Sequence, residues 1–325
     1  MDQVLSLAAS NLLSPIILSF ALGVAASMAR SDLSVPEAAA KALSIYLLFA
    51  IGFKGGVSVA AHGIDAKLGL TLFAGIILSA ALPLIAFALL NVMTKLSRLD
   101  AAAVAAHYGS ISIVTFVAAT AVLESSGITS EGYMVAVAAA MEAPAILSAL
   151  WLISRGSPDR RMDGQLWREI LLNGSIVLLI GSFFIGWITG EEGLAEISSF
   201  IVAPFKGVLC LFLLDMGLVA GRGLRGGGGV LRPGVLAFGV LMPLIGSALG
   251  AGFGLALGLS SGGLALLMVL SASASYIAVP AAMRVALPEA NPSIYLTLSL
   301  GVTFPFNLTL GIPLYIAVAA AITGG

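Results

Sequence analysis

The chain has 325 residues, of which 59% are hydrophobic and 10% are charged, whereas a soluble domain carries about a quarter charged residues. This composition excludes an ordinary soluble protein and predicts a polytopic membrane protein with little mass outside the lipid bilayer. The net charge of −1 argues against a nucleic-acid partner, and a single cysteine, Cys210, excludes a disulfide framework.

Ten apolar windows follow one another along the chain, each near the ~20 residues that a helix needs to span a bilayer. We therefore predict an all-α membrane protein of ten transmembrane helices. The windows are 11–29, 38–60, 68–92, 101–122, 131–154, 170–189, 196–220, 233–257, 262–286 and 293–322.

Basic residues predict the orientation of these helices, because cytoplasmic loops carry an excess of Lys and Arg. The asymmetry places both termini on the extracytoplasmic side of the cell's inner (plasma) membrane. The extracytoplasmic side has Lys67 as its one clear loop cation. The loops assigned to the cytoplasm hold Arg30, Lys95, Arg98, Arg155, Arg160, Arg161, Arg168, Arg222, Arg225 and Arg232.

The polar segment 156–169 divides the ten helices into five and five. We predict a first repeat over 1–155, a cytoplasmic linker over 156–169, and a second repeat over 170–325 with inverted topology. Ile51–Gly56 resembles Met216–Gly221, and 217 − 52 gives an offset of 165 residues. Glu142 matches Asn307 at the same offset, 307 − 142 = 165. A shared offset favours an internal repeat over chance similarity.

Two serine-rich stretches at matching positions predict that the fourth and ninth helices are broken. Freed backbone groups survive in a membrane only in a protein interior or a watery cavity, and broken helices commonly form the substrate sites of transporters. Small residues could instead serve close helix packing, but two matching runs favour a site. The predicted substrate-binding residues are Gly109, Ser110, Ser112, Thr115, Ser273, Ser275 and Tyr276.

Ionisable residues within the apolar windows are expensive in a bilayer and usually face the bundle interior. Glu142 precedes Pro144, so its carboxylate lies beside a weakened helical turn. With the hydroxyls of Ser110 and Ser275 it offers the oxygen ligands of a small cation such as sodium. Lys54 and Asp215 form a predicted charge pair, either a structural ion pair or part of the transport path.

Several motifs resemble the sodium-dependent bicarbonate transporter family typified by cyanobacteria, over nearly the whole chain. This resemblance implies inverted five-helix repeats, a core domain moving against a gate domain in an elevator-like cycle, and a homotrimer. It also implies sodium-coupled bicarbonate uptake, with both ions held between the two broken helices. The motifs are Gly52–Gly56, Met141–Ala145, Ser273–Ser275, Asn291–Tyr295 and Gly311–Ile316.

The chain departs from the family pattern at the breaks themselves. The family usually has an aspartate at Tyr276 and a Gly-Ser pair at Ile113-Val114. Its other polar positions at the second break correspond to Ala274, Ala278 and Val279. One carboxylate fewer predicts weaker sodium binding, because affinity for hard cations follows ligand charge. The family's intramembrane lysine and acid match Ala50 and Val219, whereas this chain has Lys54 and Asp215.

Three functions are compatible with these patterns. The first is a secondary active transporter of bicarbonate or a similar small anion, with sodium as coupling ion and no other cofactor. The second is a transporter of the same fold that carries a different organic anion without sodium. The third is a non-transporting membrane sensor or scaffold. The sequence shows no nucleophile–base pair, so we expect no enzyme. Because the segment Arg155–Arg168 is short, the sequence does not decide whether a cytosolic regulatory partner binds there.

Overall fold

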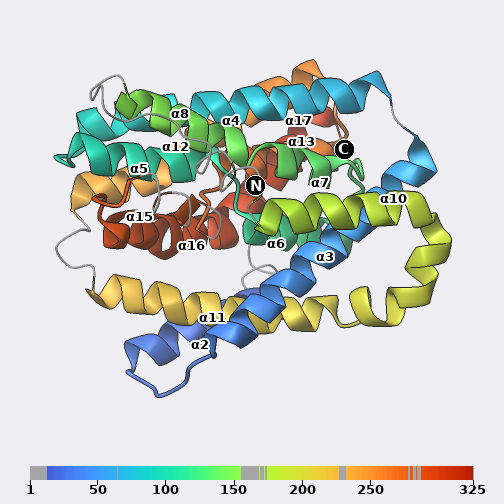
Figure 1. Ribbon diagram of the computed structural model, residues 1–325, viewed down its shortest axis with the longest axis horizontal. Coiled ribbons are helices and arrows are strands. Elements are labelled where there is room, and N and C mark those ends of the chain that lie inside the picture. Colours follow the sequence, from blue (N-terminus) through green and yellow to red (C-terminus); the bar gives the residue numbers. More distant parts are fainter. Residues whose placement is uncertain are drawn as a thin grey trace.

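The computed structural model consists of apolar helices joined by short connections (Figure 1). It describes residues 13–63, 65–154, 174–226, 232–276 and 287–324, with Arg168, Leu172, Val279, Pro280 and Met283. Within these ranges no strand is present, which confirms the predicted all-helical class. Most of the predicted linker 156–169 lies outside the described residues.

The helices of the N-terminal half correspond to the first five apolar windows, with the fourth and fifth windows each divided in two. Figure 1 shows them in blue to light green. They are α2 (Pro15–Met28), α3 (Glu37–His62), α4 (Ala66–Met93), α5 (Arg98–Gly109), α6 (Ile113–Ser125), α7 (Met134–Ala140) and α8 (Ala143–Ser154).

The C-terminal half begins with three long helices and ends with one long, irregular span. That last span contains two π-helical turns, η1 and η2, on either side of Pro305. The elements are α10 (Gly174–Ile201), α11 (Phe205–Gly226), α12 (Pro233–Ala256), α13 (Ser261–Ala272), α15 (Pro292–Leu298), η1 (Ser299–Thr303), α16 (Phe304–Phe306), η2 (Asn307–Gly311) and α17 (Ile312–Thr323).

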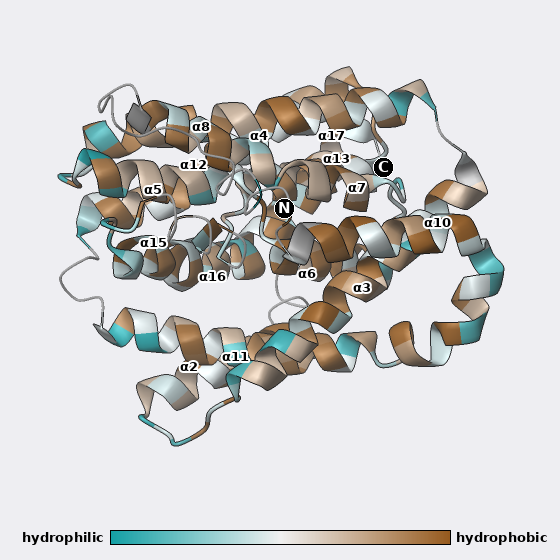
Figure 2. Ribbon diagram, viewed as in Figure 1, coloured by the Kyte–Doolittle hydropathy of each residue, from teal (hydrophilic) through white to brown (hydrophobic). Residues whose placement is uncertain are grey.

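Eight spans in the described part of the chain are long and apolar enough to cross a membrane. Two further predicted windows, the first and the ninth, correspond to the shorter apolar helices α2 and α13. Hydrophobic residues run along the helices, and hydrophilic ones gather at helix ends and in connections (Figure 2). Large side chains such as Val92, 86% exposed, and Ile188, 78% exposed, face outward, as lipid-facing residues must.

The helices pack in two groups. Helices α2, α3, α10 and α11 form the first, here called the four-helix group, in which α3 packs along α10 and α2 along α11. Helices α4 to α8, α12, α13 and the last span form the second, here called the crossing group. In Figure 1 the four-helix group lies along the lower and right edges of the molecule.

Glycines bring the helices of the four-helix group into backbone contact. A Cβ atom at Gly56 would collide with the carbonyl oxygen of Phe183, and one at Gly186 with that of Phe53. At the second crossing, Gly23 of α2 and Gly217 of α11 press on each other in the same manner. Small residues permit such close approach, and in a membrane the resulting van der Waals contact drives helix association.

One acidic side chain ties the connection between α6 and α7 to the start of α13. The carboxylate of Glu131 accepts hydrogen bonds from the N–H (2.8 Å) and the hydroxyl (2.7 Å) of Ser260, and Lys67 lies 3.5 Å away. Burial raises the pKa of Glu131, but the Ser260 hydrogen bonds and the Lys67 charge outweigh it and hold the pKa below its usual value. Glu131 is therefore committed to partners inside the crossing group.

The α3–α10 crossing predicts a position-dependent cost for a larger side chain on α10. Gly186→Val should destabilise the protein by about 1–3 kcal/mol or more, because the new side chain meets the backbone of α3. The control is Gly181→Val, the same change on the same helix, where a Cβ atom meets nothing within 4 Å. Thermal unfolding in detergent measures both. Equal melting temperatures for the two variants would contradict the proposed contact.

Candidate functional site

Both predicted helix breaks are present. Helix α5 ends at Gly109 and α6 begins at Ile113, and Ser110 between them has an extended backbone (φ −89°, ψ 144°). Helix α13 ends at Ala272, and Ser273 is likewise extended (φ −85°, ψ 162°). The helix expected after the second break contains residues outside the described part of the chain. The prediction that these two segments are interrupted is confirmed.

The two breaks contact each other through their backbones. The N–H of Ser275 donates to the carbonyl oxygens of His107 (2.8 Å) and Ser110 (3.1 Å). In return, the hydroxyl oxygen of Ser273 accepts from the N–H of Ser112 (2.9 Å). All of these residues are buried. Groups freed by one interrupted helix are thus satisfied by the other, as a membrane interior requires.

Local sequence explains why α6 starts where it does. Ser112 is its N-cap, and the Ser112 hydroxyl oxygen accepts hydrogen bonds from the N–H (3.2 Å) and the hydroxyl (2.9 Å) of Thr115. Serine is a preferred N-cap because its short side chain reaches the first free N–H groups. The predicted site residues Ser112 and Thr115 therefore hold the break in shape, and Ser112 does so with both its backbone and its side chain.

Two proline-containing helices press on the breaks from outside. A Cβ atom at Gly109 would collide with the ring of Pro83 in α4, and one at Gly246 of α12 would collide with the carbonyl oxygen of Ser271. A larger side chain at Gly109 would therefore push α5 away from α4, and one at Gly246 would push α12 away from α13. The close packing fixes where each helix ends.

Several buried polar atoms around the breaks lack a hydrogen-bond partner among the described residues. Buried polar groups are nearly always paired, so each unpaired one is a place where a polar ligand can bind. The atoms are the hydroxyls of Ser110, Ser271 and Tyr276, Nε2 of His107 and Oε2 of Glu142.

Glu142 lies at the junction of α7 and α8 and is only 3% exposed. The preceding carbonyl, that of Met141, accepts a hydrogen bond from the Ser79 hydroxyl of α4 (2.6 Å). Helix α8 packs against α4 and α5. Glu142 immediately precedes α8 and therefore lies at the start of a helix that contacts the first broken segment. Its carboxylate brings a buried oxygen ligand into the same group of helices as the two breaks.

The family model of the Na+-dependent bicarbonate transporter superfamily matches residues 15–320. The chain belongs to this superfamily. A search of curated proteins gives no match. Membership confirms the resemblance inferred from the motifs, and it supports a transporter in a membrane rather than an enzyme.

Within this superfamily member, the departures from the family pattern fall on the breaks. Ile113 and Val114 form the first turn of α6 and are buried. Tyr276 is buried in the second break, with its ring edge against Phe304 (5.3 Å between centroids). An aromatic ring therefore occupies the position where the family pattern has an aspartate, so this break is less polar than the pattern implies.

Asn307 is a site residue that the sequence reasoning did not select. Its amide nitrogen donates to the carbonyl oxygen of Ala272 (2.8 Å), the last residue of α13, and its amide oxygen accepts from the Tyr315 hydroxyl (3.0 Å). Asn307 thereby ties the last span to the second break. The sequence signal that could have identified Asn307 is its match with Glu142 at the repeat offset of 165 residues.

His107 was also missed. It is fully buried, its Nδ1 lies 2.7 Å from the carbonyl oxygen of Ala103, and its ring stacks on Tyr295 (4.5 Å between centroids). Its own carbonyl receives the Ser275 N–H described above. A histidine two residues before a Gly-Ser break in an apolar window was the signal that could have identified it.

In the described part of the structure, Lys54 does not form its ion pair with Asp215. Lys54 instead forms an ion pair with Glu124 at the end of α6, 2.9 Å between Nζ and Oε1. Asp215 is buried on α11, and Arg222 follows it about two turns further along the same helix. The reason is geometric: equivalent positions in two repeats need not face each other, and a lysine side chain reaches whichever carboxylate lies beside it.

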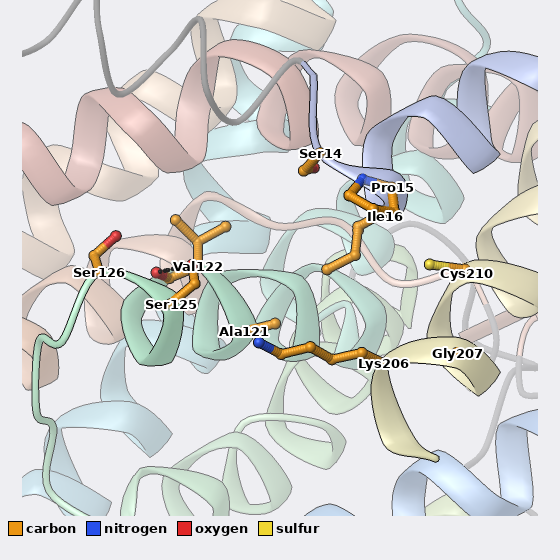
Figure 3. Close-up of a pocket in the computed structure, with 10 residues that line it drawn as sticks. All are labelled: Ser14, Pro15, Ile16, Ala121, Val122, Ser125, Ser126, Lys206, Gly207 and Cys210. Atoms are coloured by element: carbon orange, nitrogen blue, oxygen red, sulfur yellow. Dashed lines mark hydrogen bonds between the residues drawn. The ribbon is translucent and has the colours of Figure 1, made fainter. Parts of the chain in front are cut away.

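Lys206 lines a pocket of about 530 Å³ between the first turns of α2 and α11 and the last turns of α6. Figure 3 shows its side chain extending toward α6 beside Ala121. The pocket is lined by Ser14, Pro15, Ile16, Ala121, Val122, Ser125, Ser126, Lys206, Gly207 and Cys210.

The backbone contact between the breaks predicts unequal effects for two neighbouring serines. Ser273→Ala should lower stability by about 1–3 kcal/mol, because the buried N–H of Ser112 loses its acceptor. Ser271→Ala is the matched control, since the Ser271 hydroxyl has no partner among the described residues. Thermal unfolding in detergent without substrate compares them. A larger loss for Ser271→Ala would show that the contact between the breaks is not formed.

Proposed function

We propose that the protein is a secondary active transporter that takes up bicarbonate or a similar small anion together with sodium. The observation that carries this proposal is the contact between the two broken helices, with unpaired polar atoms buried around it. In a member of a Na+-dependent bicarbonate transporter superfamily, such a place is the natural position for the transported ions.

The first break offers what a small anion needs. The first N–H groups of a helix have no partner inside the helix, and at α6 those of Ile113 and Val114 begin the first turn. The helix dipole adds positive potential at the same end. The buried hydroxyl of Ser110, the backbone at Gly109 and the hydroxyls of the second break can complete a set of donors around the oxygens of bicarbonate.

Sodium is proposed to bind beside the anion. Hard cations prefer carboxylate, hydroxyl and carbonyl oxygens. Glu142 can supply the negative charge, Ser110 and Ser275 can supply hydroxyls, and the interrupted helices supply free carbonyl oxygens. Tyr276 adds a hydroxyl without charge at neutral pH. A site of this composition should bind sodium more weakly than one that also contains an aspartate.

Alternating access is proposed to occur by movement of the crossing group against the four-helix group. The four-helix group is a suitable fixed part because glycine contacts lock α3 to α10 and α2 to α11. The similar crossings of these two pairs support the predicted inverted repeat, as does the offset of 163 residues between the two breaks (273 − 110 = 163), which is close to the 165 of the other matches. From the sequence arguments given above, the proposal also includes a homotrimer and an extracytoplasmic position for both termini.

A second candidate is a transporter of a larger or less polar organic anion that does not use sodium. The residues at the breaks favour it specifically. Ile113, Val114 and Tyr276 place apolar surface where the family pattern has a Gly-Ser pair and an aspartate. A less polar pocket disfavours a strongly hydrated ion and favours a carboxylate attached to a hydrocarbon group.

Uptake of labelled bicarbonate into proteoliposomes tests the proposed function. Uptake should require an inward sodium gradient and should cease when potassium replaces sodium. Uptake that ignores sodium, or appears only with an organic carboxylate, would favour the second candidate. Specific ligand binding without flux would support a sensor instead.

The sodium site predicts opposite effects for two substitutions. Glu142→Gln should reduce sodium-stimulated uptake at least about tenfold, because the site loses its negative charge. Tyr276→Asp should lower the sodium concentration that gives half-maximal uptake, since it adds a carboxylate. Glu192→Gln, an exposed position on α10, is the control and should behave like the wild type. Unchanged sodium dependence in Glu142→Gln would show that Glu142 is not a sodium ligand.

A further inference from the structure

The interface between the two helix groups carries one ion pair at one of its ends. Lys54 belongs to α3 of the four-helix group, and Glu124 belongs to α6 of the crossing group. Their charged atoms lie 2.9 Å apart, and their side chains are 32% and 44% exposed. The Lys54 ammonium also lies 5.6 Å from the centre of the Phe205 ring at the start of α11. This lysine of α3 therefore contacts α6 across the interface and α11 within its own group.

The other carboxylate near Lys54, that of Glu131, is already engaged, so Lys54 pairs with Glu124. A pocket of about 220 Å³ opens beside the pair and is lined by Ser58 of α3, Thr120 of α6 and Glu131. Glu131 could compete for the lysine, but it is engaged with Ser260 and Lys67 inside the crossing group. Glu124 is consequently the carboxylate of this pocket that remains available for Lys54.

Packing around the pair is tight on the four-helix side. A Cβ atom at Gly55 would collide with Val135 of α7, and one at Gly132 would collide with the side chain of Ser58. Lys54 thus lies next to close contacts of α3 with the crossing group, so sliding of the two groups past each other cannot leave its distance to Glu124 unchanged.

The other end of α11 has no such tie. A pocket of about 310 Å³ lies there between α11 and the last span, lined by Arg222, Ser293 and Thr297. Within the described residues, Arg222 forms no ion pair across the interface. The nearby Arg225 donates to the carbonyl oxygen of Ser27 (2.6 Å), a contact inside the four-helix group. Charge therefore joins the two groups at the Lys54 end.

We propose that the Lys54–Glu124 ion pair is an electrostatic latch that stabilises one end state of the movement between the two helix groups. This inference rests on the proposed function, because a latch matters only if the groups move. Since the pair is partly exposed, its contribution is modest and is screened by salt. The latch shifts the balance between two conformations without locking the protein in either.

Spin-label distances measure this balance directly. In a Cys210→Ala background, labels at Val92→Cys on α4 and Ile188→Cys on α10 report the separation of the two groups from highly exposed positions. The samples are the wild-type pair, Lys54→Met, Glu124→Gln, the double variant and the charge exchange of Lys54→Glu with Glu124→Lys. Lys67→Met is the control, because its ion pair with Glu131 lies within one group.

Each single variant should shift the ratio of the two distance populations by up to about fivefold. The double variant should shift it no further than either single change, and the charge exchange should restore the wild-type ratio. Lys67→Met should leave the ratio unchanged. Added salt should move the wild type toward the single variants. An unchanged ratio in both single variants, a single distance in every sample, or a charge exchange that behaves like Lys54→Met would overturn the latch.

Uptake in proteoliposomes separates this inference from the proposed function. Restored ratios in the charge exchange support the latch even if no bicarbonate enters the vesicles, in which case the proposed substrate is wrong. Sodium-driven uptake with unchanged distance ratios in the single variants would overturn the latch and leave the transporter proposal in place.

Discussion

The structure depends on one constraint, that backbone groups freed inside a membrane must find partners. Two helices stop within the protein, at Gly109 and Ala272, and each would leave polar groups exposed to hydrocarbon if it stood alone. The contact of Ser275 with His107 and Ser110, and of Ser112 with Ser273, resolves this for both helices together. The two breaks therefore satisfy each other's polar groups.

Two kinds of packing surround this pair and differ in their consequences. In the four-helix group, glycines such as Gly56 and Gly186 bring backbones together, which favours a rigid body. In the crossing group, hydrogen bonds from side chains such as Asn307 fix the ends of interrupted helices. Between the groups the described contacts include the partly exposed pair Lys54–Glu124. Relative movement requires that contacts of this kind break and form again.

The chemistry of the site differs from the family pattern in one direction. Hydroxyl and carboxylate groups are replaced at the breaks by Ile113, Val114 and Tyr276, while a helix N-terminus remains at the first break. Anion recognition by N–H groups and a helix dipole does not depend on side-chain identity, whereas cation recognition does. The proposed sodium coupling is thus the property that these substitutions should affect most.

The sequence by itself determined the helical membrane class, the two breaks and the superfamily, because hydropathy, serine–proline patterns and motifs are local properties of the chain. It also indicated Ser112, whose role as the N-cap of α6 is a short-range effect. The tertiary structure alone decided which distant groups meet. It paired Lys54 with Glu124 rather than Asp215 and brought Asn307 to the end of α13. Such partners depend on how helices rotate and slide against one another, and sequence periodicity does not encode those relative positions.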